Sequence, residues 1–398
     1  MTPAVIAEQR VLQHETMEQR RLWPARSPWL GAAVNALPRE DFAPDRVWRW
    51  DGHAYVPVDR ATEPRGWAGE VYGDPFAAAV TQVRGGLATS SLSCTAVVVD
   101  MLDSLLLEPG QRVLELGTGT GWNAALLAWR AGSSRVVTIE VDAGLAEQAR
   151  SRLRAAGTAV DVHVADGADG WPDGGPYDRV IATYAVDSVP WAWVAGTRPG
   201  GRIVAPWGRL GHVALTVADN GQYAQGWFQG LAQFMPARGT GTPDRTFAQV
   251  RGGAPAQDER VVTRELSPLR DSQHLLFALR VALPQVRITT GTDQDGVNAW
   301  LHDGLSSWAA LSAAGTGRTI AYQAGPRRLA DEVENAWDTW ERAGSPTVYD
   351  FGMTVTARGQ VVWANDPVTG PRWPATTAPP HRQPAAHASP TACTGAET

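Results

Sequence analysis

The sequence has no lysine and only two cysteines, and each scarcity excludes a class of site. Cys94 and Cys393 are too few for a disulfide framework or a cysteine-built zinc site. A phosphate-binding P-loop requires a Gly-Lys-Ser/Thr motif, which a chain without lysine does not have. No apolar run reaches the roughly 20 residues that span a bilayer, and the polar N-terminus lacks the apolar segment of a signal peptide. We therefore expect a cytoplasmic protein that does not bind membranes.

Positive charge is also scarce. Against 41 acidic side chains there are 35 basic ones, all arginine, which gives a net charge of −6. Without a basic run, this balance argues against nucleic acid as the main partner. The histidines show no metal-ligand spacing, so we expect no metal; those considered are His163, His212, His274 and His302. The sequence implies no oligomeric state.

The composition is that of a globular chain, with 43% hydrophobic residues in 398. We expect five regions. Prolines should exclude a long helix from a helical or irregular N-terminal extension, and the last region is too poor in apolar residues to fold. The regions are the extension (1–60), a central domain (61–235), a Gly- and Pro-rich linker (236–260), a C-terminal α+β accessory domain (261–373) and a disordered tail (374–398).

The central domain alternates short β-branched runs with helical ones. This alternation of strands and helices predicts an α/β fold of the Rossmann-like type. Such a fold has a doubly wound and mostly parallel sheet with helices on both faces. Strands are expected at 112–116, 136–140, 160–164, 179–183 and 203–205, and helices at 95–107, 122–129 and 143–156. In the accessory domain one helix has a single apolar face made by Leu329, Val333, Ala336, Trp337 and Trp340.

The clearest binding signal is the glycine-rich segment 113–121, which leaves the first predicted strand and enters a helix. Glycines there let the backbone approach a ligand at the carboxyl end of a parallel strand. A dinucleotide-binding fingerprint requires a further glycine where this chain has Trp122, whose bulk would crowd a pyrophosphate. The pattern favours a ligand with a ribose and without phosphate, and S-adenosyl-L-methionine fits.

Acidic residues after the next two strands agree with this ligand, although each alone is also typical of an ordinary loop. Glu140 closes the second strand, where a carboxylate can accept both ribose hydroxyls. Asp166-Gly167 follows the third strand, where the adenine edge would lie. The expected cofactor-binding residues are Glu115, Gly117, Thr118, Gly119, Thr120, Gly121, Asn123, Glu140, Asp166 and Gly167.

From about residue 60 to 210 the sequence resembles the protein-L-isoaspartate O-methyltransferases. The resemblance implies a methyltransferase fold and methyl transfer from S-adenosyl-L-methionine to a carboxylate, with S-adenosylhomocysteine as product. It is carried by Leu92-Ser93, the segment 113–121, Ile139-Glu140, Asp166-Gly167, Tyr177-Asp178-Arg179, Thr183, Val189-Pro190 and Arg198-Pro199-Gly200-Gly201, with Leu37-Pro38-Arg39-Glu40-Asp41-Phe42 upstream.

The additional length resembles a subgroup that matures ribosomally made peptides, namely lanthipeptides and graspetides (the products of ATP-grasp ligases). This resemblance implies methylation of an Asp side chain in a modified precursor peptide, followed by closure to a succinimide (aspartimide) and hydrolysis to isoaspartate. Residues 261–373 would then help to recognise the peptide. The segments that carry it are 189–193, 234–236, 325–329, 331–333 and 351–356.

The acceptor loop departs from the repair enzymes, which have proline and an aromatic residue or histidine after the serine. This chain reads Ser93-Cys94-Thr95-Ala96, which indicates a changed acceptor pocket. With no histidine partner recognised, Cys94 is expected to be a small packing residue rather than a nucleophile.

A carboxylate is already anionic at neutral pH, so methyl transfer to it needs positioning and exclusion of water rather than a general base. Ser93, beside Leu92, is expected to orient the acceptor through its hydroxyl; capping the next helix is the structural alternative. Thr183 is expected to line the methyl-transfer channel or to cap its strand. Trp191 and Trp193 are expected to border the acceptor cleft or to pack in the core.

Three other functions fit the same residues. The first is general repair of isoaspartyl proteins, the second is methylation of a small molecule, and the third is a scaffold that binds S-adenosyl-L-methionine without catalysis. Activity on ordinary isoaspartyl peptides, activity on metabolites, or cofactor binding without transfer would distinguish them.

Overall fold

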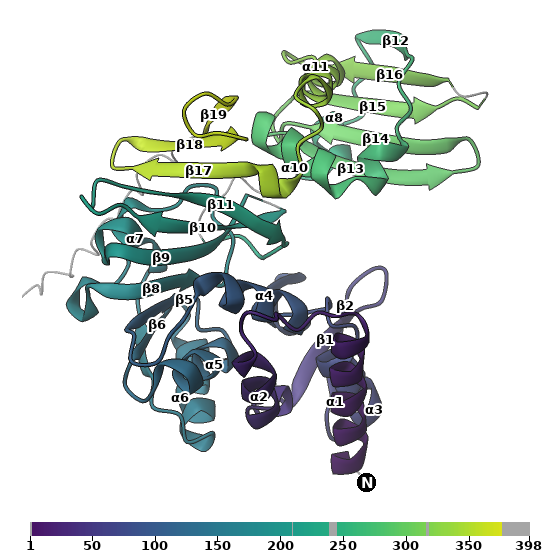
Figure 1. The fold of residues 1–398 in the computed structure, drawn as a ribbon. Helices are drawn as coiled ribbons and strands as arrows, with labels where there is room; N and C mark the ends of the chain where they lie inside the picture. Colours follow the sequence, from purple (N-terminus) through teal and green to yellow (C-terminus); the bar gives the residue numbers. More distant parts are fainter. Residues whose placement is uncertain (1, 209, 239–244, 316–317, 376–398) are drawn as a thin grey trace, which may run out of the picture.

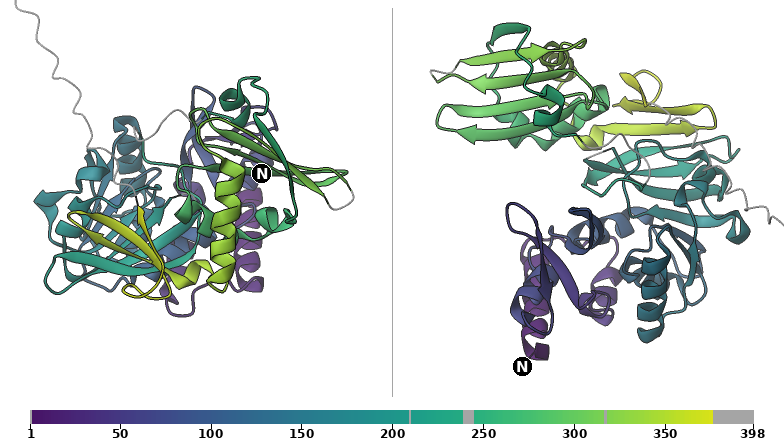
Figure 2. Two further views of the ribbon diagram at one scale, coloured as in Figure 1. Left: turned by 90° about the horizontal axis from the view of Figure 1, so that it is seen from above. Right: turned by 180° about the vertical axis from the view of Figure 1, so that it is seen from behind.

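A computed structural model describes residues 2–208, 210–238, 245–315 and 318–375, and it has three parts (Figure 1). An N-terminal layer of helices and a small sheet lies at one end, a ten-stranded sheet forms the middle, and a five-stranded sheet with helices lies at the other end. The view from behind in Figure 2 shows the same order. No helix within the described ranges is long and apolar enough to cross a membrane.

The ten-stranded sheet combines a parallel half with an antiparallel half. Its order is β19-β18-β17-β11-β10-β9-β8-β5-β6-β7, and the strands from β7 to β9 pair in parallel, whereas every other pair is antiparallel. The strands are β5 (Val113–Leu116), β6 (Val136–Glu140), β7 (Asp161–Val164), β8 (Tyr177–Ala182), β9 (Thr197–Trp207), β10 (Gly211–Val217), β11 (Tyr223–Leu231), β17 (Phe351–Thr356), β18 (Gly359–Ala364) and β19 (Arg372–Ala375).

The α/β fold of the methyltransferase type is thus confirmed, but the expectation of a mostly parallel sheet holds only for β7 to β9. For the pairs β9-β10, β10-β11, β17-β18 and β18-β19 the reason is the length of the connection. β9 ends at Trp207 and β10 begins at Gly211, and so short a connection permits only an antiparallel hairpin, because a parallel crossover needs a dozen or more residues.

Helices cover both faces of the parallel half. Val113 and Val136 belong to the core cluster that contains α4 (Thr95–Leu105) and α5 (Trp122–Ala131), whereas Leu114 and Ile139 belong to the cluster that contains α7 (Trp191–Ala195). Successive strand residues point to opposite faces, so these strands carry buried apolar residues on both faces. The remaining helical elements of this part are α6 (Ala143–Ala155), η2 (Gly167–Asp169) and η3 (Pro172–Gly174).

The N-terminal layer contains the long helix that the prolines were expected to exclude. That expectation is wrong because Pro3 lies in the first turn of the helix, where proline is tolerated, and the other prolines follow its end. The layer also crosses the expected boundary at residue 60, since its sheet, in the order β2-β1-β3-β4, extends to residue 92. Its elements are α1 (Thr2–Gln19), α2 (Trp29–Ala36), η1 (Arg39–Asp41), β1 (Arg46–Trp50), β2 (Tyr55–Asp59), α3 (Pro64–Tyr72), β3 (Ala79–Arg84) and β4 (Leu87–Leu92).

The C-terminal region divides differently from the expected accessory domain of residues 261–373. The five-stranded sheet, in the order β12-β16-β15-β14-β13, packs against a helix whose Leu329, Val333 and Trp337 are buried, as its apolar face predicted. Residues from Phe351 onward instead join the ten-stranded sheet. The elements are α8 (Phe247–Arg251), β12 (Asp258–Val262), α9 (Ser267–Asp271), α10 (Gln273–Ala282), β13 (Arg287–Asp293), β14 (Gly296–His302), β15 (Trp308–Ala313), β16 (Thr319–Ala324), α11 (Leu329–Arg342) and η4 (Val348–Asp350).

The expected linker, 236–260, is in part regular structure, since it contains α8 and the start of β12, while 239–244 lie outside the described residues. The expected tail, 374–398, lies outside them from residue 376 onward.

Candidate active site

A cavity of about 870 Å³ opens at the carboxyl ends of β5, β6 and β8. The chain order of the parallel strands reverses between β5 and β8, which is the place where open α/β sheets bind ligands. Most of the residues expected at the site line this cavity: Leu92, Ser93, Gly117, Thr118, Gly119, Thr120, Asn123, Glu140, Asp166, Gly167, Thr183 and Trp193. Glu115, Gly121 and Trp191 are not among its lining residues.

The glycine segment lines the cavity with Gly117, Thr118, Gly119 and Thr120. Gly117, Gly119 and Gly121 have φ angles of +95°, +54° and +93°, a region that side-chain-bearing residues rarely adopt. A Cβ atom on Gly117 would also lie 2.5 Å from Oγ1 of Thr183 and 2.9 Å from a ring carbon of Tyr184. Glycine at position 117 is therefore required both by the backbone conformation and by the close approach of β8.

Glu140 lies at the end of β6 with its carboxylate held by two backbone donors. Gly119 N donates to Oε2 at 2.9 Å, and Asp142 N donates to Oε1 at 3.0 Å. The residue is only 6% exposed, yet it lines the cavity. A carboxylate fixed in this way can accept further hydrogen bonds from hydroxyl groups of a ligand, as a ribose would provide.

Asp166 and Gly167 form a turn that Trp193 supports. Asp166 Oδ1 accepts a hydrogen bond from Ala168 N at 2.9 Å and so starts η2. Trp193 is 1% exposed and donates from Nε1 to the Gly167 carbonyl at 2.8 Å. Trp193 therefore belongs to both expected categories, core packing and cavity wall, whereas the half-buried Trp191 packs against the core and does not line the cavity.

Glu115 occupies a different position from the one we expected. It is fully buried and accepts hydrogen bonds from Asn123 Nδ2, at 2.7 Å, and from the Thr138 hydroxyl. Burial raises its pKa to about 7, although both hydrogen bonds act in the opposite direction. Glu115 does not line the cavity, and its connection to the cavity runs through Asn123, which does.

The loop after β4, where we expect the acceptor to bind, also lines the cavity. The Ser93 carbonyl accepts a hydrogen bond of 2.6 Å from Nη1 of Arg39, whose guanidinium lies 4.8 Å from the centre of the Trp122 ring. The Pro-Arg element of the sequence therefore fixes this loop against the helix that follows the glycine segment. The N-cap of α4 is Cys94, not Ser93, so the structural alternative for Ser93 is not observed.

Thr183 lies at the end of β8, and its role in a methyl-transfer channel stays a prediction. It lines the cavity, and its hydroxyl donates a hydrogen bond to the Gly117 carbonyl. This bond joins the end of β8 to the glycine segment.

The sequence interpretation gave no role to the segment 233–238, which forms one wall of the cavity. Its backbone pairs with that of Ala185. Ala185 N donates to the Met235 carbonyl at 2.8 Å, and Ala237 N donates to the Ala185 carbonyl at 2.9 Å. The sequence signal for this segment is the Phe234-Met235-Pro236 motif, which belongs to the subgroup resemblance. Among the described residues, no group of three His, Cys, Asp or Glu side chains could hold a metal ion.

Comparisons with known proteins match the sequence of the chain to one family. The family model of protein-L-isoaspartate(D-aspartate) O-methyltransferase matches residues 57–236. A protein-L-isoaspartate O-methyltransferase of Methylorubrum extorquens is 36% identical over 217 residues, covering 53% of this chain and 82% of the relative. One from Methylorubrum populi is 38% identical over 174 residues, covering 43% and 73%.

Among solved structures, a protein-L-isoaspartate O-methyltransferase has a TM-score of 0.46 and 20% identity, covering 90% of this chain and 100% of its own. The sequence matches carry the assignment: this chain belongs to the protein-L-isoaspartate(D-aspartate) O-methyltransferase family.

Proposed function

We propose that this S-adenosyl-L-methionine-dependent carboxyl O-methyltransferase acts on an isoaspartyl carboxylate of a peptide or protein. The observation that supports the proposal most strongly is the composition of the cavity wall. The glycine segment and Glu140 form one side, and the loop containing Ser93 forms the other. The methyl donor would bind beside the glycine segment and Glu140, and the carboxylate acceptor beside the loop that contains Ser93. The two reactants would thus meet in the cavity.

The residues present fit the cofactor. The backbone at Gly117 and Gly119, which carries no side chain, would admit its methionine part. Glu140 would accept its ribose hydroxyls. Asn123 and Asp166 would hold its remaining polar edges. When bound, the cofactor supplies an electrophilic methyl group on a sulfonium.

The acceptor carboxylate needs no base. Its oxygen forms the new bond to the methyl carbon, the carbon–sulfur bond breaks, and the electron pair of that bond stays on sulfur, so no proton is transferred. Among the described residues of the cavity wall, Arg238 is the one basic side chain, and it is paired with Asp142. Hydroxyls such as those of Ser91 and Ser93 would orient the acceptor without neutralising its charge, which keeps its oxygen nucleophilic.

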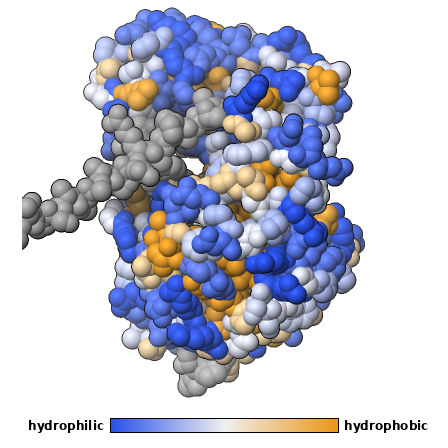
Figure 3. All heavy atoms as spheres, turned by 90° about the vertical axis from the view of Figure 1, so that its left-hand side faces the viewer, coloured by the Kyte–Doolittle hydropathy of each residue, from blue (hydrophilic) through white to orange (hydrophobic). Residues whose placement is uncertain are grey.

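A second candidate is an Asp side chain of a modified peptide. Two observations favour it: Cys94 lines the cavity where the repair enzymes have a different residue, and a five-stranded sheet domain is inserted between β11 and β17. The face of the molecule shown in Figure 3 is mostly hydrophilic, with hydrophobic residues gathered near its middle. With this acceptor the next backbone nitrogen would attack the ester carbonyl, and methoxide would leave with the amide proton as methanol, giving a succinimide.

The test compares three substrates in the presence of S-adenosyl-L-methionine: an isoaspartyl peptide, the same peptide with ordinary Asp, and a ring-containing modified precursor peptide. Mass spectrometry detects the replacement of one hydrogen by a methyl group. Esterification of the isoaspartyl peptide alone supports the first proposal. Esterification of the modified peptide alone, followed by loss of methanol, supports the second. Both proposals fail if none of the peptides is methylated while S-adenosylhomocysteine still binds.

A further inference from the structure

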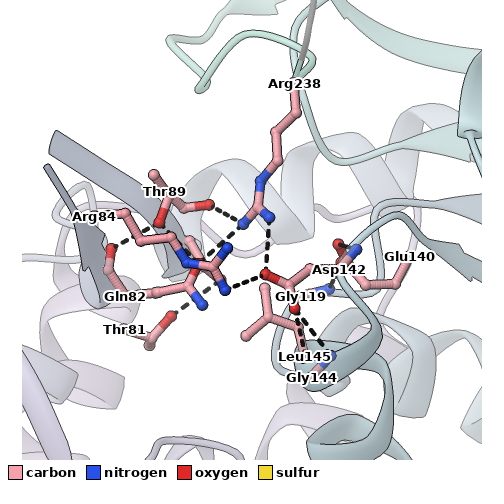
Figure 4. Close-up of polar contacts among 11 residues, drawn as sticks. Thr81, Gln82, Arg84, Thr89, Gly119, Glu140, Asp142, Gly144, Leu145 and Arg238 are labelled. Carbon is pink, nitrogen blue, oxygen red and sulfur yellow. Dashed lines mark hydrogen bonds and ion pairs between the residues drawn. The ribbon is translucent and has the colours of Figure 1, made fainter. Parts of the chain in front are cut away.

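Two guanidiniums join the two walls of the cavity. Arg84, at the end of β3, donates from Nη2 to Asp142 Oδ2 at 2.8 Å, and Arg238 binds the same oxygen. Arg238, at the end of the segment 233–238, reaches both α6 and the β3–β4 hairpin (Figure 4). Its Nη1 donates to Asp142 Oδ2 at 3.0 Å, and its Nη2 donates to the Thr89 carbonyl at 2.7 Å and to Gln82 Oε1 at 3.1 Å. The side chain is one-third exposed and lines the cavity.

On the cofactor side, Asp142 connects Arg238 to Glu140 through hydrogen bonds. Asp142 caps α6 by accepting from Gly144 N at 2.9 Å and Leu145 N at 3.2 Å, and its own N–H donates to Glu140. Its side chain is only 8% exposed. Burial alone would raise the pKa of Asp142, but the hydrogen bonds from Arg238 and Leu145 and the charge of Arg84 lower it to about 2. The carboxylate is therefore always charged near neutral pH.

On the acceptor side, Arg238 binds the strand that leads into the loop containing Ser93. Thr89 lies in β4 (Leu87–Leu92), which runs directly into that loop. Gln82 Oε1 also accepts a hydrogen bond of 2.8 Å from the Thr89 hydroxyl. Arg238 thus holds the strand at a backbone carbonyl, which no side-chain rotation in β4 can release.

We propose that Arg238 is a positioning residue, which fixes the separation between the cofactor wall at Glu140 and the acceptor wall at Ser93. This inference rests on the proposed methyl transfer. In-line attack demands accurate placement of the two reactants, and a misplacement of about 1 Å can cost a factor of about 100 in rate. Arginine suits the task because its planar fork donates in several fixed directions at once, whereas lysine acts as a point charge.

The test uses the full chain with Arg238→Ala and Arg238→Lys, and with Arg46→Ala as a matched control. Arg46 is likewise paired with a carboxylate, through two hydrogen bonds of 2.9 and 3.1 Å to Asp59, but it does not line the cavity. Three quantities are measured: kcat and KM for an isoaspartyl peptide, Kd for S-adenosylhomocysteine by calorimetry, and deuterium uptake of residues 79–92 with and without S-adenosylhomocysteine.

For Arg238→Ala we expect kcat to fall about 10- to 100-fold, with Kd for S-adenosylhomocysteine within about threefold of the wild type. Arg238→Lys should recover part of the rate, and Arg46→Ala should change neither quantity. In the wild type, S-adenosylhomocysteine should slow exchange in residues 79–92. Arg238→Ala should weaken this protection while leaving cofactor binding intact, because Arg84 still joins the hairpin to Asp142. The lysine variant keeps the test decisive if the alanine variant does not fold.

Three results would overturn the inference. They are wild-type kcat in Arg238→Ala, equal losses of kcat and cofactor affinity, and an absence of hairpin protection in the wild type. The exchange measurement needs no acceptor. If the wild type methylates no peptide but Arg238 still couples cofactor binding to the hairpin, the proposed function fails and the structural coupling stands.

Discussion

Replacing Glu115 by Gln tests whether the buried carboxyl of β5 keeps its proton at neutral pH. Glu115 is fully buried, and burial raises its pKa from 4.5 to about 7. Between these two values the unfolded chain loses the proton while the folded chain keeps it. Because the folded state then binds more protons than the unfolded state, the free energy of unfolding falls as pH rises through this window and stays lowered above it.

The magnitude follows from the two pKa values. A tenfold change in proton affinity is worth about 1.4 kcal/mol, so stability should fall by roughly 2–3 kcal/mol between pH 5 and pH 8. Gln has nearly the same shape, can accept from Asn123 through its amide oxygen, and does not ionise. We therefore expect the advantage of Glu115→Gln over the wild type to grow by roughly 2–3 kcal/mol across that range.

Guanidinium unfolding of both proteins at several pH values, followed by tryptophan fluorescence, measures this difference. Glu147→Gln is the matched control, because Glu147 lies on α6 with a 64% exposed side chain and its ion pairs are at the surface; it should change stability by less than about 1 kcal/mol at every pH. A Glu115→Gln advantage that stays constant from pH 5 to pH 8 would show that Glu115 does not hold its proton in the folded state.

Three further substitutions test the site. Glu140→Ala should weaken S-adenosylhomocysteine binding by about 1.5–3 kcal/mol, through loss of hydrogen bonds to a charged group, and calorimetry that finds unchanged affinity would remove Glu140 from the cofactor wall. Gly117→Ala should abolish cofactor binding and destabilise the fold by at least about 1–3 kcal/mol, because φ is +95° and the new Cβ would meet Thr183; a thermal scan and a titration check both effects. Ser93→Ala should leave cofactor affinity intact while lowering kcat, and a fully active variant would show that Ser93 does not orient the acceptor.

The parallel half of the fold was predictable because its signals are local. The strand Val136–Glu140 was expected at its exact residues, and the glycine segment marked the end of β5. By contrast, α1 buries only a few side chains, among them Ile6 and Met17, so its apolar periodicity is weak.

Features that depend on distant parts of the chain were not predictable. The pairing of β11 with β17 brings Trp227 opposite Gly352, where a Cβ atom would lie 2.1 Å from the Trp363 ring. No local pattern announces such a fit. Likewise, Arg238 binds Asp142 and Gln82, which lie 96 and 156 residues away, so composition and spacing gave no sign of this contact.

The return of the chain to the ten-stranded sheet determines how the accessory part can be removed. A protein ended before Phe351 would lose β17, β18 and β19 and leave β11 as an unpaired edge, which invites aggregation. Internal excision between Arg238 and Phe351, closed by a short flexible linker, would preserve all ten strands. The accessory sheet is connected to the ten-stranded sheet at both of its ends. Its motion relative to that sheet is therefore more restricted than that of a terminal domain on one linker.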